Sequence, residues 1–272
     1  MGMRLNETDI RMMIGECVKR ILEVHGALDE KLEGLAELII KRVKSGEDKF
    51  ALSQEEIEQY YPYKHVPGSL NVSVQFLKPG AEASYSMTTN TIKISPGVRY
   101  LSTDEHFMEV LMHELTHFVN NNESDGSLSK WVPIDHEPDG PGIIAKKIEY
   151  LFDPSEMQAR VTQFKIRLKN SKERKKLSEF NDITGLGTME RLIGIVENEK
   201  QPTDEEPLSV VELLLCQRGN KKSQLDGRTR FLNPSAEDFY KAKKAIVKKL
   251  KMAYKSFFAK ISKIYYDEMG QY

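Results

Sequence analysis

Apolar residues recur three and four positions apart over much of the chain, which is the spacing expected of amphipathic helices. Each such stretch places its apolar side chains on one face, which can pack against a core. The pattern therefore predicts a helix-rich protein. The predicted helices run over Asp9–His25, Leu28–Lys44, a short helix capped by Ser53 and Glu56 and stopped by Pro62, Asp153 to about Phe180, Met189–Val196, Val210–Cys216 and Ala236–Met269.

A different pattern occupies the region between residues 70 and 94. Leu70–Phe76 alternates apolar and polar residues, which is typical of a strand with one buried face. Ala83–Met87 and Thr91–Ile94 indicate two more strands, and Lys78-Pro79-Gly80 indicates a turn before them. The sequence therefore predicts an α+β fold, in which a small mixed or antiparallel sheet is flanked by N- and C-terminal helices.

Another helix is expected directly after these strands. Ser102 and Glu105 have the spacing of a capping box, and apolar residues follow at helical spacing. Asn120-Asn121-Asn122 is a plausible end, because asparagine tolerates the left-handed conformation found there. This predicted helix contains the sequence His113-Glu114-Leu115-Thr116-His117, which matches H-E-x-x-H.

The H-E-x-x-H match predicts a zinc site. Positions i and i+4 share one face of a helix, so the imidazoles of His113 and His117 can point at one metal ion. Glu114 then lies beside the open coordination position, where it can take a proton from a water bound to the metal. These residue types at this spacing are typical of zinc-dependent peptidases.

A catalytic zinc ion normally has three protein ligands, and two residues compete to be the third. Glu123 lies six residues after His117, which is the metzincin spacing, but Asn120 replaces the metzincin glycine and a glutamate replaces its histidine. Glu156 begins a later helix, where it is either a capping-box partner of Asp153 or a zinc ligand. We favour Glu156 as the ligand.

Glu156-Met157-Gln158-Ala159 resembles the E-x-x-A motif of the gluzincin metallopeptidases, which carry H-E-x-x-H on one helix and a ligand glutamate on a later one. Tyr150–Arg160 also resembles small metallopeptidase-like proteins of tailed bacteriophages. The resemblance covers about residues 66 to 165. It implies a zincin-like core, one catalytic Zn²⁺ held by His113, His117 and Glu156, and Glu114 as the catalytic residue. The residues that orient a histidine in thermolysin-like members have no counterpart around Glu156.

The same resemblance implies an edge strand that pairs with the substrate backbone, and Thr91–Ile94 is the candidate. A long segment rich in Ser, Asp, Gly and Pro, at about residues 121 to 142, separates the two expected ligand helices. Within or near it, His136, Tyr150 and Arg160 are candidates to stabilise the oxyanion of the reaction.

Composition limits the other classes of function. The net charge of −1 gives no general attraction to nucleic acid or membranes. Cys17 and Cys216 form neither a disulfide framework nor a zinc-finger spacing, so buried thiols in a reducing setting are expected. No apolar run reaches membrane-spanning length and no signal-peptide pattern opens the sequence. We expect a cytoplasmic protein, in the host cytoplasm or virion if it is phage-encoded, that is not secreted and binds no membrane.

Three segments are expected: an N-terminal helical segment (1–64), a zincin-like catalytic core (65–182) and a C-terminal helical segment (183–272). The last helix, Ala236–Met269, carries nine lysines, which suit either a solvated face or, less often, nucleic acid.

The expected function is a zinc-dependent metallopeptidase that hydrolyses a peptide or protein substrate through a glutamate-activated, zinc-bound water. The alternative is a non-enzymatic phage structural or interaction protein with a vestigial or structural metal site.

Overall fold

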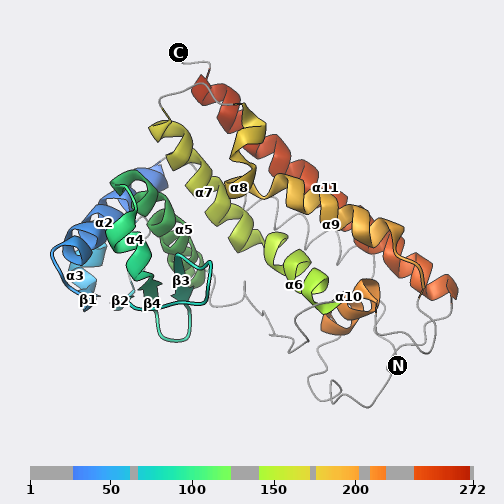
Figure 1. Ribbon diagram of the computed structural model, residues 1–272, viewed down its shortest axis with the longest axis horizontal. Helices are drawn as coiled ribbons and strands as arrows, with labels where there is room; N and C mark the ends of the chain where they lie inside the picture. Colours follow the sequence, from blue (N-terminus) through green and yellow to red (C-terminus); the bar gives the residue numbers. More distant parts are fainter. Residues whose placement is uncertain are drawn as a thin grey trace. The chain divides into compact units, whose positions relative to one another are not determined.

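The computed structural model describes residues 27–61, 67–123, 141–171, 176–201, 209–218 and 236–269 (Figure 1). The fold is α+β, with helices around one small mixed sheet, as the sequence predicts. The chain forms two compact units. The first comprises Met1–Ser129, Pro154–Thr184 and Lys260–Tyr272, and the second comprises Lys130–Asp153 and Gly185–Ala259.

The sheet of the first unit has four strands in the order β1-β2-β4-β3. They are β1 (Lys49–Ser53), β2 (Ser69–Val74), β3 (Ala83–Ser86) and β4 (Thr91–Ile94). β2 and β4 are parallel, whereas β1 and β3 each pair antiparallel with their neighbours. The three predicted strands are confirmed. The choice of Thr91–Ile94 as an edge strand is wrong, because β4 lies between β2 and β3 and both of its edges are bonded.

β1 was not predicted, and it lies inside the segment expected to be helical (1–64). Only Phe50 and Leu52 face the interior along its five residues, too short a repeat for the pattern to be recognised. The short helix after it, α3 (Gln54–Glu58), begins as expected. Ser53 Oγ accepts from Glu56 N at 3.3 Å, and Glu56 Oε2 accepts from Ser53 N at 2.8 Å, which completes the predicted capping box.

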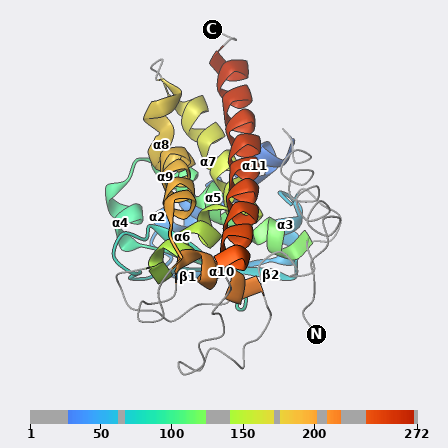
Figure 2. The same cartoon turned by 90° about the vertical axis from the view of Figure 1, so that its right-hand side faces the viewer.

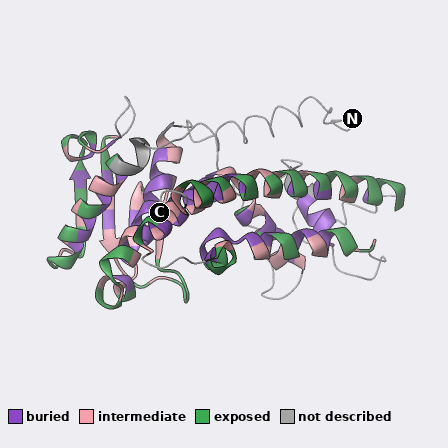
Figure 3. Cartoon of the chain, turned by 90° about the horizontal axis from the view of Figure 1, so that it is seen from above, coloured by how far each residue is buried: buried purple, intermediate pink, exposed green. Residues whose placement is uncertain are grey.

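One apolar core joins the sheet to α2 (Ala27–Lys44) and α5 (Asp104–Glu123). Buried side chains from every second residue of β2 and β4 meet those on one stripe of each helix, as the two periodicities require. Figure 3 shows this interior in purple. Its members include Leu35, Ile39 and Val43 of α2, Leu70 and Val72 of β2, Ile92 and Ile94 of β4, and Phe107, Leu111, Leu115 and Phe118 of α5.

The ends of α5 differ from the expectation. Thr103, not Ser102, caps the helix, since Thr103 Oγ1 accepts from His106 N at 3.2 Å. The hydroxyl of Ser102 instead donates to Val98 O at the end of α4 (Pro96–Leu101). At its other end, α5 runs through the asparagines to Glu123, one residue past the predicted stop at Asn120–Asn122. Asn122 Nδ2 donates to Phe118 O one turn back at 2.6 Å.

α7 (Pro154–Asn170) packs along α5. Charged groups reinforce this packing: Arg167 Nε bonds to the buried carboxylate of Glu109, and Lys169 Nζ lies 2.9 Å from Glu33 Oε2 on α2. Burial raises the pKa of Glu109, and the hydrogen bond and charge of Arg167 offset part of that rise.

The single helix expected from Asp153 to about Phe180 is wrong in its second half. α7 ends at Asn170, and a 3₁₀ turn, η1 (Leu177–Phe180), and a short helix, α8 (Asn181–Thr184), follow. The last buried apolar residue of α7 is Leu168, and the next residues are polar or charged, so the apolar stripe no longer holds the helix against α5.

The second unit is helical where it is described. It contains α6 (Pro141–Leu151), which the sequence analysis did not predict, α9 (Leu186–Asn198), α10 (Val210–Arg218) and α11 (Ala236–Met269) as far as Ala259. α11 is one unbroken helix in Figure 2, and one side of it is exposed along its length in Figure 3. Among the described helices, none is both long enough and apolar enough to cross a membrane.

A carboxylate joins α9 to α10 within the second unit. The two oxygens of Glu199 accept from the backbone N–H groups of Val210 and Val211, at 2.7 and 3.0 Å. Lys243 Nζ of α11 donates to the carbonyl oxygen of the same glutamate at 2.9 Å. The free N–H groups at the start of α10 are thereby satisfied by a residue that is distant in sequence.

Candidate metal centre

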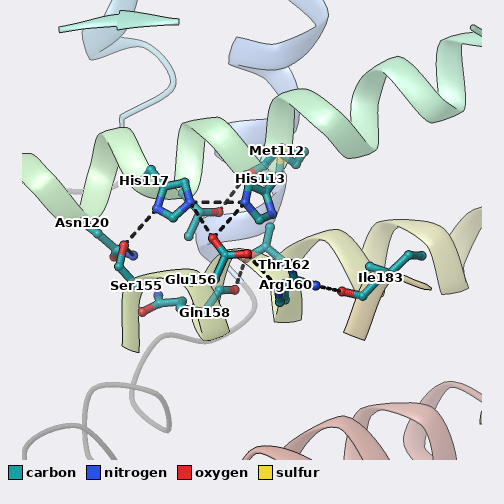
Figure 4. Close-up of polar contacts among 11 residues, drawn as sticks. Met112, His113, His117, Asn120, Ser155, Glu156, Gln158, Arg160, Thr162 and Ile183 are labelled. Carbon is teal, nitrogen blue, oxygen red and sulfur yellow. Dashed lines mark hydrogen bonds and ion pairs between the residues drawn. The ribbon is translucent and has the colours of Figure 1, made fainter. Parts of the chain in front are cut away.

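Two helices of the first unit bring three candidate ligands together. His113 and His117 lie one turn apart on α5, on the face that meets α7, and Glu156 lies in the first turn of α7 (Figure 4). Side-chain exposure is 12% for His113, 22% for His117 and 2% for Glu156. The group is therefore closed by protein on the side of the carboxylate and reaches solvent beside His117.

The three donor atoms form a nearly equilateral triangle. His113 Nε2 and His117 Nε2 are 3.2 Å apart, and Glu156 Oε2 lies 3.4 Å from the first and 3.3 Å from the second. In a tetrahedral zinc site with bonds of about 2.0–2.1 Å, two ligand atoms are separated by about 3.3 Å. The donor set and its spacing thus fit a metal ion, and the group His113, His117 and Glu156 is close enough to hold one.

Electrostatics keep the carboxylate of Glu156 ionised. Burial raises its pKa, but the imidazoles of His113 and His117 at 3.4 and 3.3 Å from Oε2, together with the charge of Arg160, outweigh burial and hold the pKa well below its usual value. Burial lowers the pKa of His113, yet the neighbouring carboxylate of Glu156, at 3.4 Å, and the charge of Glu114 raise it overall. Without a metal, a proton stabilises this cluster; a divalent cation would take the place of that proton.

The ring nitrogen of His117 that faces away from the other two candidate ligands, Nδ1, has a hydrogen-bond partner on α7. This Nδ1 lies 3.0 Å from Ser155 Oγ, and Asn120 Nδ2 donates to the same oxygen at 3.3 Å. The contact between Ser155 and His117 was not predicted, because the sequence around Glu156 lacks the thermolysin-like residues that orient a histidine. A signal was present: Asn120 lies three residues after His117, on the same side of the helix.

Arg160 fixes the other end of the ligand carboxylate. Its Nε donates to Glu156 Oε1 at 2.6 Å, and its Nη1 donates to Ile183 O at 2.7 Å (Figure 4). With Oε1 held in this way, Oε2 is the oxygen that faces the two histidines. Arg160 thus contacts the carboxylate of Glu156. Its expected role in stabilising the oxyanion stays a prediction.

Glu114, the expected catalytic residue, is buried on α5 with 8% exposure. Its charge raises the pKa of His113, which places it within electrostatic reach of the ligands. Among the described residues, no hydrogen bond or ion pair of its carboxylate is found. A carboxylate in that state retains lone pairs that can accept a proton.

Several expected site residues cannot be compared with this centre. Glu123 ends α5, but its side chain lies outside the described residues, as do His136 and Cys17. The side chain of Cys216 is likewise outside them. Tyr150 belongs to α6 of the second unit, where it is exposed. Of the two candidates for third ligand, Glu156 is the one that joins the histidines in the described structure.

Comparisons with known proteins do not assign the chain to a family. No protein-family model matches it, and neither a curated protein nor a solved structure does. The resemblance to gluzincins stays a prediction based on the H-E-x-x-H and E-x-x-A motifs.

Proposed function

We propose that the protein is a gluzincin-like, zinc-dependent metallopeptidase that hydrolyses peptide bonds in a peptide or protein substrate. One observation carries the proposal: His113 Nε2, His117 Nε2 and Glu156 Oε2 converge with separations of 3.2 to 3.4 Å. Two imidazoles and one carboxylate are a donor set that suits catalytic zinc and leaves a coordination position open.

Each residue of the centre has a distinct role in this proposal. His113, His117 and Glu156 hold the ion. Bound zinc supplies Lewis-acid chemistry, since it polarises a carbonyl group and lowers the pKa of water. Glu114 accepts the proton of the attacking water and passes it to the leaving amine, which requires a carboxylate with a free lone pair. The position of Glu114, buried beside His113 and close enough for its charge to raise the pKa of that residue, supports that role.

The substrate backbone needs a strand with a free edge, and β3 replaces β4 as the candidate. β3 is at one end of the described sheet and lies against α5. Tyr85 of β3 packs edge-on against Phe118, with ring centroids 6.1 Å apart, and its hydroxyl accepts from Asn121 Nδ2 at 3.1 Å. Both contacts are on the turn that follows His117. An extended peptide added to β3 would be held by main-chain hydrogen bonds beside the ligand helix.

The variant Glu114→Gln tests the mechanism. Glutamine has the shape of glutamate but cannot accept the proton, so we expect unchanged zinc content and a fall in peptide hydrolysis of about 10²–10⁴-fold. Metal analysis after dialysis and a fluorogenic peptide assay measure the two quantities. Glu105→Gln, an exposed change on the same helix, is the matched control. Turnover retained by Glu114→Gln would contradict the proposed role.

Zinc content and hydrolysis together distinguish the proposal from the alternative of a non-enzymatic interaction protein. A peptidase requires both stoichiometric zinc and cleavage of a mixed peptide library by the wild-type protein. Zinc without any cleavage would favour a structural metal site. A folded protein that takes up no zinc at neutral pH would exclude the zinc mechanism.

A further inference from the structure

Ser155 lies where the two ligand helices meet. It is the second residue of α7, directly before Glu156, and its side chain is buried. Its hydroxyl oxygen faces Nδ1 of His117 at 3.0 Å, while Nε2 of the same ring faces His113 and Glu156 (Figure 4). Consecutive residues of α7 thus contact the two nitrogens of one imidazole.

We infer that Ser155 is a positioning residue of the metal centre, which orients His117 and selects its metal-binding tautomer; this inference rests on the proposed zinc site. A neutral imidazole carries its proton on one nitrogen and its lone pair on the other. When Nδ1–H donates to Ser155 Oγ, the lone pair is on Nε2, the atom that points to the other two ligands. The hydrogen bond therefore favours the form of His117 that can bind a metal.

Asn120 is a second donor to the Ser155 hydroxyl oxygen. A hydroxyl oxygen has two lone pairs and one O–H, so it could either donate to Nδ1 or accept from it. Asn120 Nδ2 donates to Ser155 Oγ at 3.3 Å and occupies one of its lone pairs. When a metal binds Nε2 of His117 the imidazole proton is on Nδ1, so the second lone pair of Ser155 Oγ accepts it and the O–H points away from the ring. Asn120 and His117 share one helix face, so α5 supplies both donors to a single acceptor on α7.

Zinc affinity is the direct test of this inference. The residues that hydrogen-bond to metal-binding histidines typically change metal affinity by 10–100-fold when they are replaced. We expect Ser155→Ala to bind zinc about 10–100-fold more weakly than wild type, in competition with a chromophoric chelator at neutral pH. Ser155→Thr keeps the hydroxyl and should restore most of the affinity. Asn120→Ala, which keeps Ser155 but removes the second donor to its hydroxyl oxygen, should give an intermediate loss.

The matched control is Thr162→Val, since Thr162 is a buried hydroxyl of α7 that donates to Gln158 O within its own helix. It should leave zinc affinity unchanged. Unfolding temperatures in excess chelator show whether a variant folds without metal, so a loss of affinity is separated from a loss of structure. If Ser155→Ala does not fold, the comparison of Asn120→Ala with Thr162→Val decides the question.

The outcomes separate two failures. If the wild type binds zinc and both Ser155→Ala and Asn120→Ala bind it equally well, the positioning role is overturned and the zinc site stands. If Ser155→Ala and Thr162→Val weaken binding alike, Ser155 acts only through packing and the inference is again overturned. If the wild type takes up no zinc, the proposed function fails, and the positioning role fails with it.

Discussion

At the scale of single residues, the candidate metal centre depends on a few hydrogen bonds, each of which leaves one side-chain atom of a candidate ligand facing the other two. Arg160 holds Oε1 of Glu156, and Ser155 faces Nδ1 of His117, so that Oε2 and Nε2 point inward. A ligand fixed in this way loses less side-chain entropy when a metal binds. The preorganisation comes from side chains of α7, which supplies one ligand and orients another.

The ion pair between Glu156 and His113 gives a pH-dependent stability in the absence of metal. The pKa of Glu156 is far below its ordinary value of 4.5, so its stabilising effect is present above pH 4.5 and is lost as pH falls through the lowered pKa. The pKa of His113 is above its ordinary 6.5, so its effect is present below pH 6.5 and is lost as pH rises through the raised pKa. In chelator, the pair should therefore stabilise the fold most between about pH 4.5 and 6.5.

Unfolding temperatures of wild type and Glu156→Gln, measured in chelator from about pH 3 to about pH 9, isolate the contribution of the Glu156–His113 pair. The quantity of interest is the difference between the two proteins at each pH. This difference in unfolding temperature should be largest between about pH 4.5 and 6.5 and should shrink at lower and at higher pH. A difference that keeps growing above pH 8 would show that His113 is not the stabilising partner. With zinc present the trend reverses, because the ion competes with the proton for the same atoms and binds more tightly as pH rises.

The sequence predicted which three residues converge at the candidate centre, but not the residues that support them. H-E-x-x-H identified His113 and His117 because a helix places i and i+4 on one face whatever surrounds it. Glu156 came from a motif on a second helix. Ser155, Asn120 and Arg160 were not assigned these contacts, since each contact depends on how α7 is rotated and shifted against α5. That packing is set by many apolar side chains together and leaves no local pattern.

At the scale of elements, the edge strand β3 offers a sharper test of substrate binding than any change at the metal. In the β3–β4 pairing, Ala83 lies opposite Ile94. One residue earlier, Glu82 lies opposite Ser95, and Glu82 O accepts from Ser95 N at 2.8 Å. Antiparallel ladders alternate, so the backbone of Ser84 bonds to β4 while the N–H of Ala83 points away from the sheet. Ala83→Pro therefore removes a donor from the open edge and keeps the ladder.

We expect Ala83→Pro to lower kcat/KM for peptide hydrolysis by about 2- to 13-fold, the equivalent of one hydrogen bond of about 0.5–1.5 kcal/mol, with little change in unfolding temperature. Ser84→Pro is the matched control: it should lower the unfolding temperature because it removes a ladder bond. Unchanged kcat/KM in a well-folded Ala83→Pro would exclude pairing at this point of β3. Zinc content should be the same as in wild type.

Element boundaries show where local patterns fail. The three strands and the caps of α3 follow from alternation and from a serine–glutamate pair, which are both local. The order of the strands depends on contacts between residues distant in sequence. β4 pairs with β2 on one side and with β3 on the other, so it lies inside the sheet, and the choice of Thr91–Ile94 as an edge strand was wrong. Ser102 was mistaken for the cap of α5 because Thr103, one residue later, has the same chemistry.

At the scale of the whole molecule, the compact units do not follow the order of the sequence. Three consecutive segments were expected, but α2 and β1 belong to the same unit as α5, and the chain passes through the second unit before Pro154–Thr184 returns to the first. Hydrophobic periodicity shows that a helix has a buried face without showing which element covers it. The division of the chain therefore could not be obtained from the sequence pattern.

Because the chain leaves the first unit and returns to it, a metal bound between α5 and α7 would stabilise one unit and not the other. The ligands come from α5 and from α7, which are adjacent in the first unit, while residues 130–153 between them belong to the second. An ion that binds only the folded site stabilises it by about 2.7 kcal/mol at a free concentration 100 times its dissociation constant. Because all three ligands are in the first unit, that stabilisation should act on the first unit.

Hydrogen exchange measured by mass spectrometry, with zinc and then with excess chelator, tests this expectation. Removing zinc should speed exchange in peptides from α5 and the first turns of α7, by up to about 100-fold if they open together. Peptides from α9 and α10, which belong to the second unit, should exchange at the same rate in both conditions. Glu156→Gln should lose the zinc effect altogether. Equal protection of both units by zinc would contradict a metal effect confined to the first, and no protection of α5 would mean that zinc does not bind between these helices.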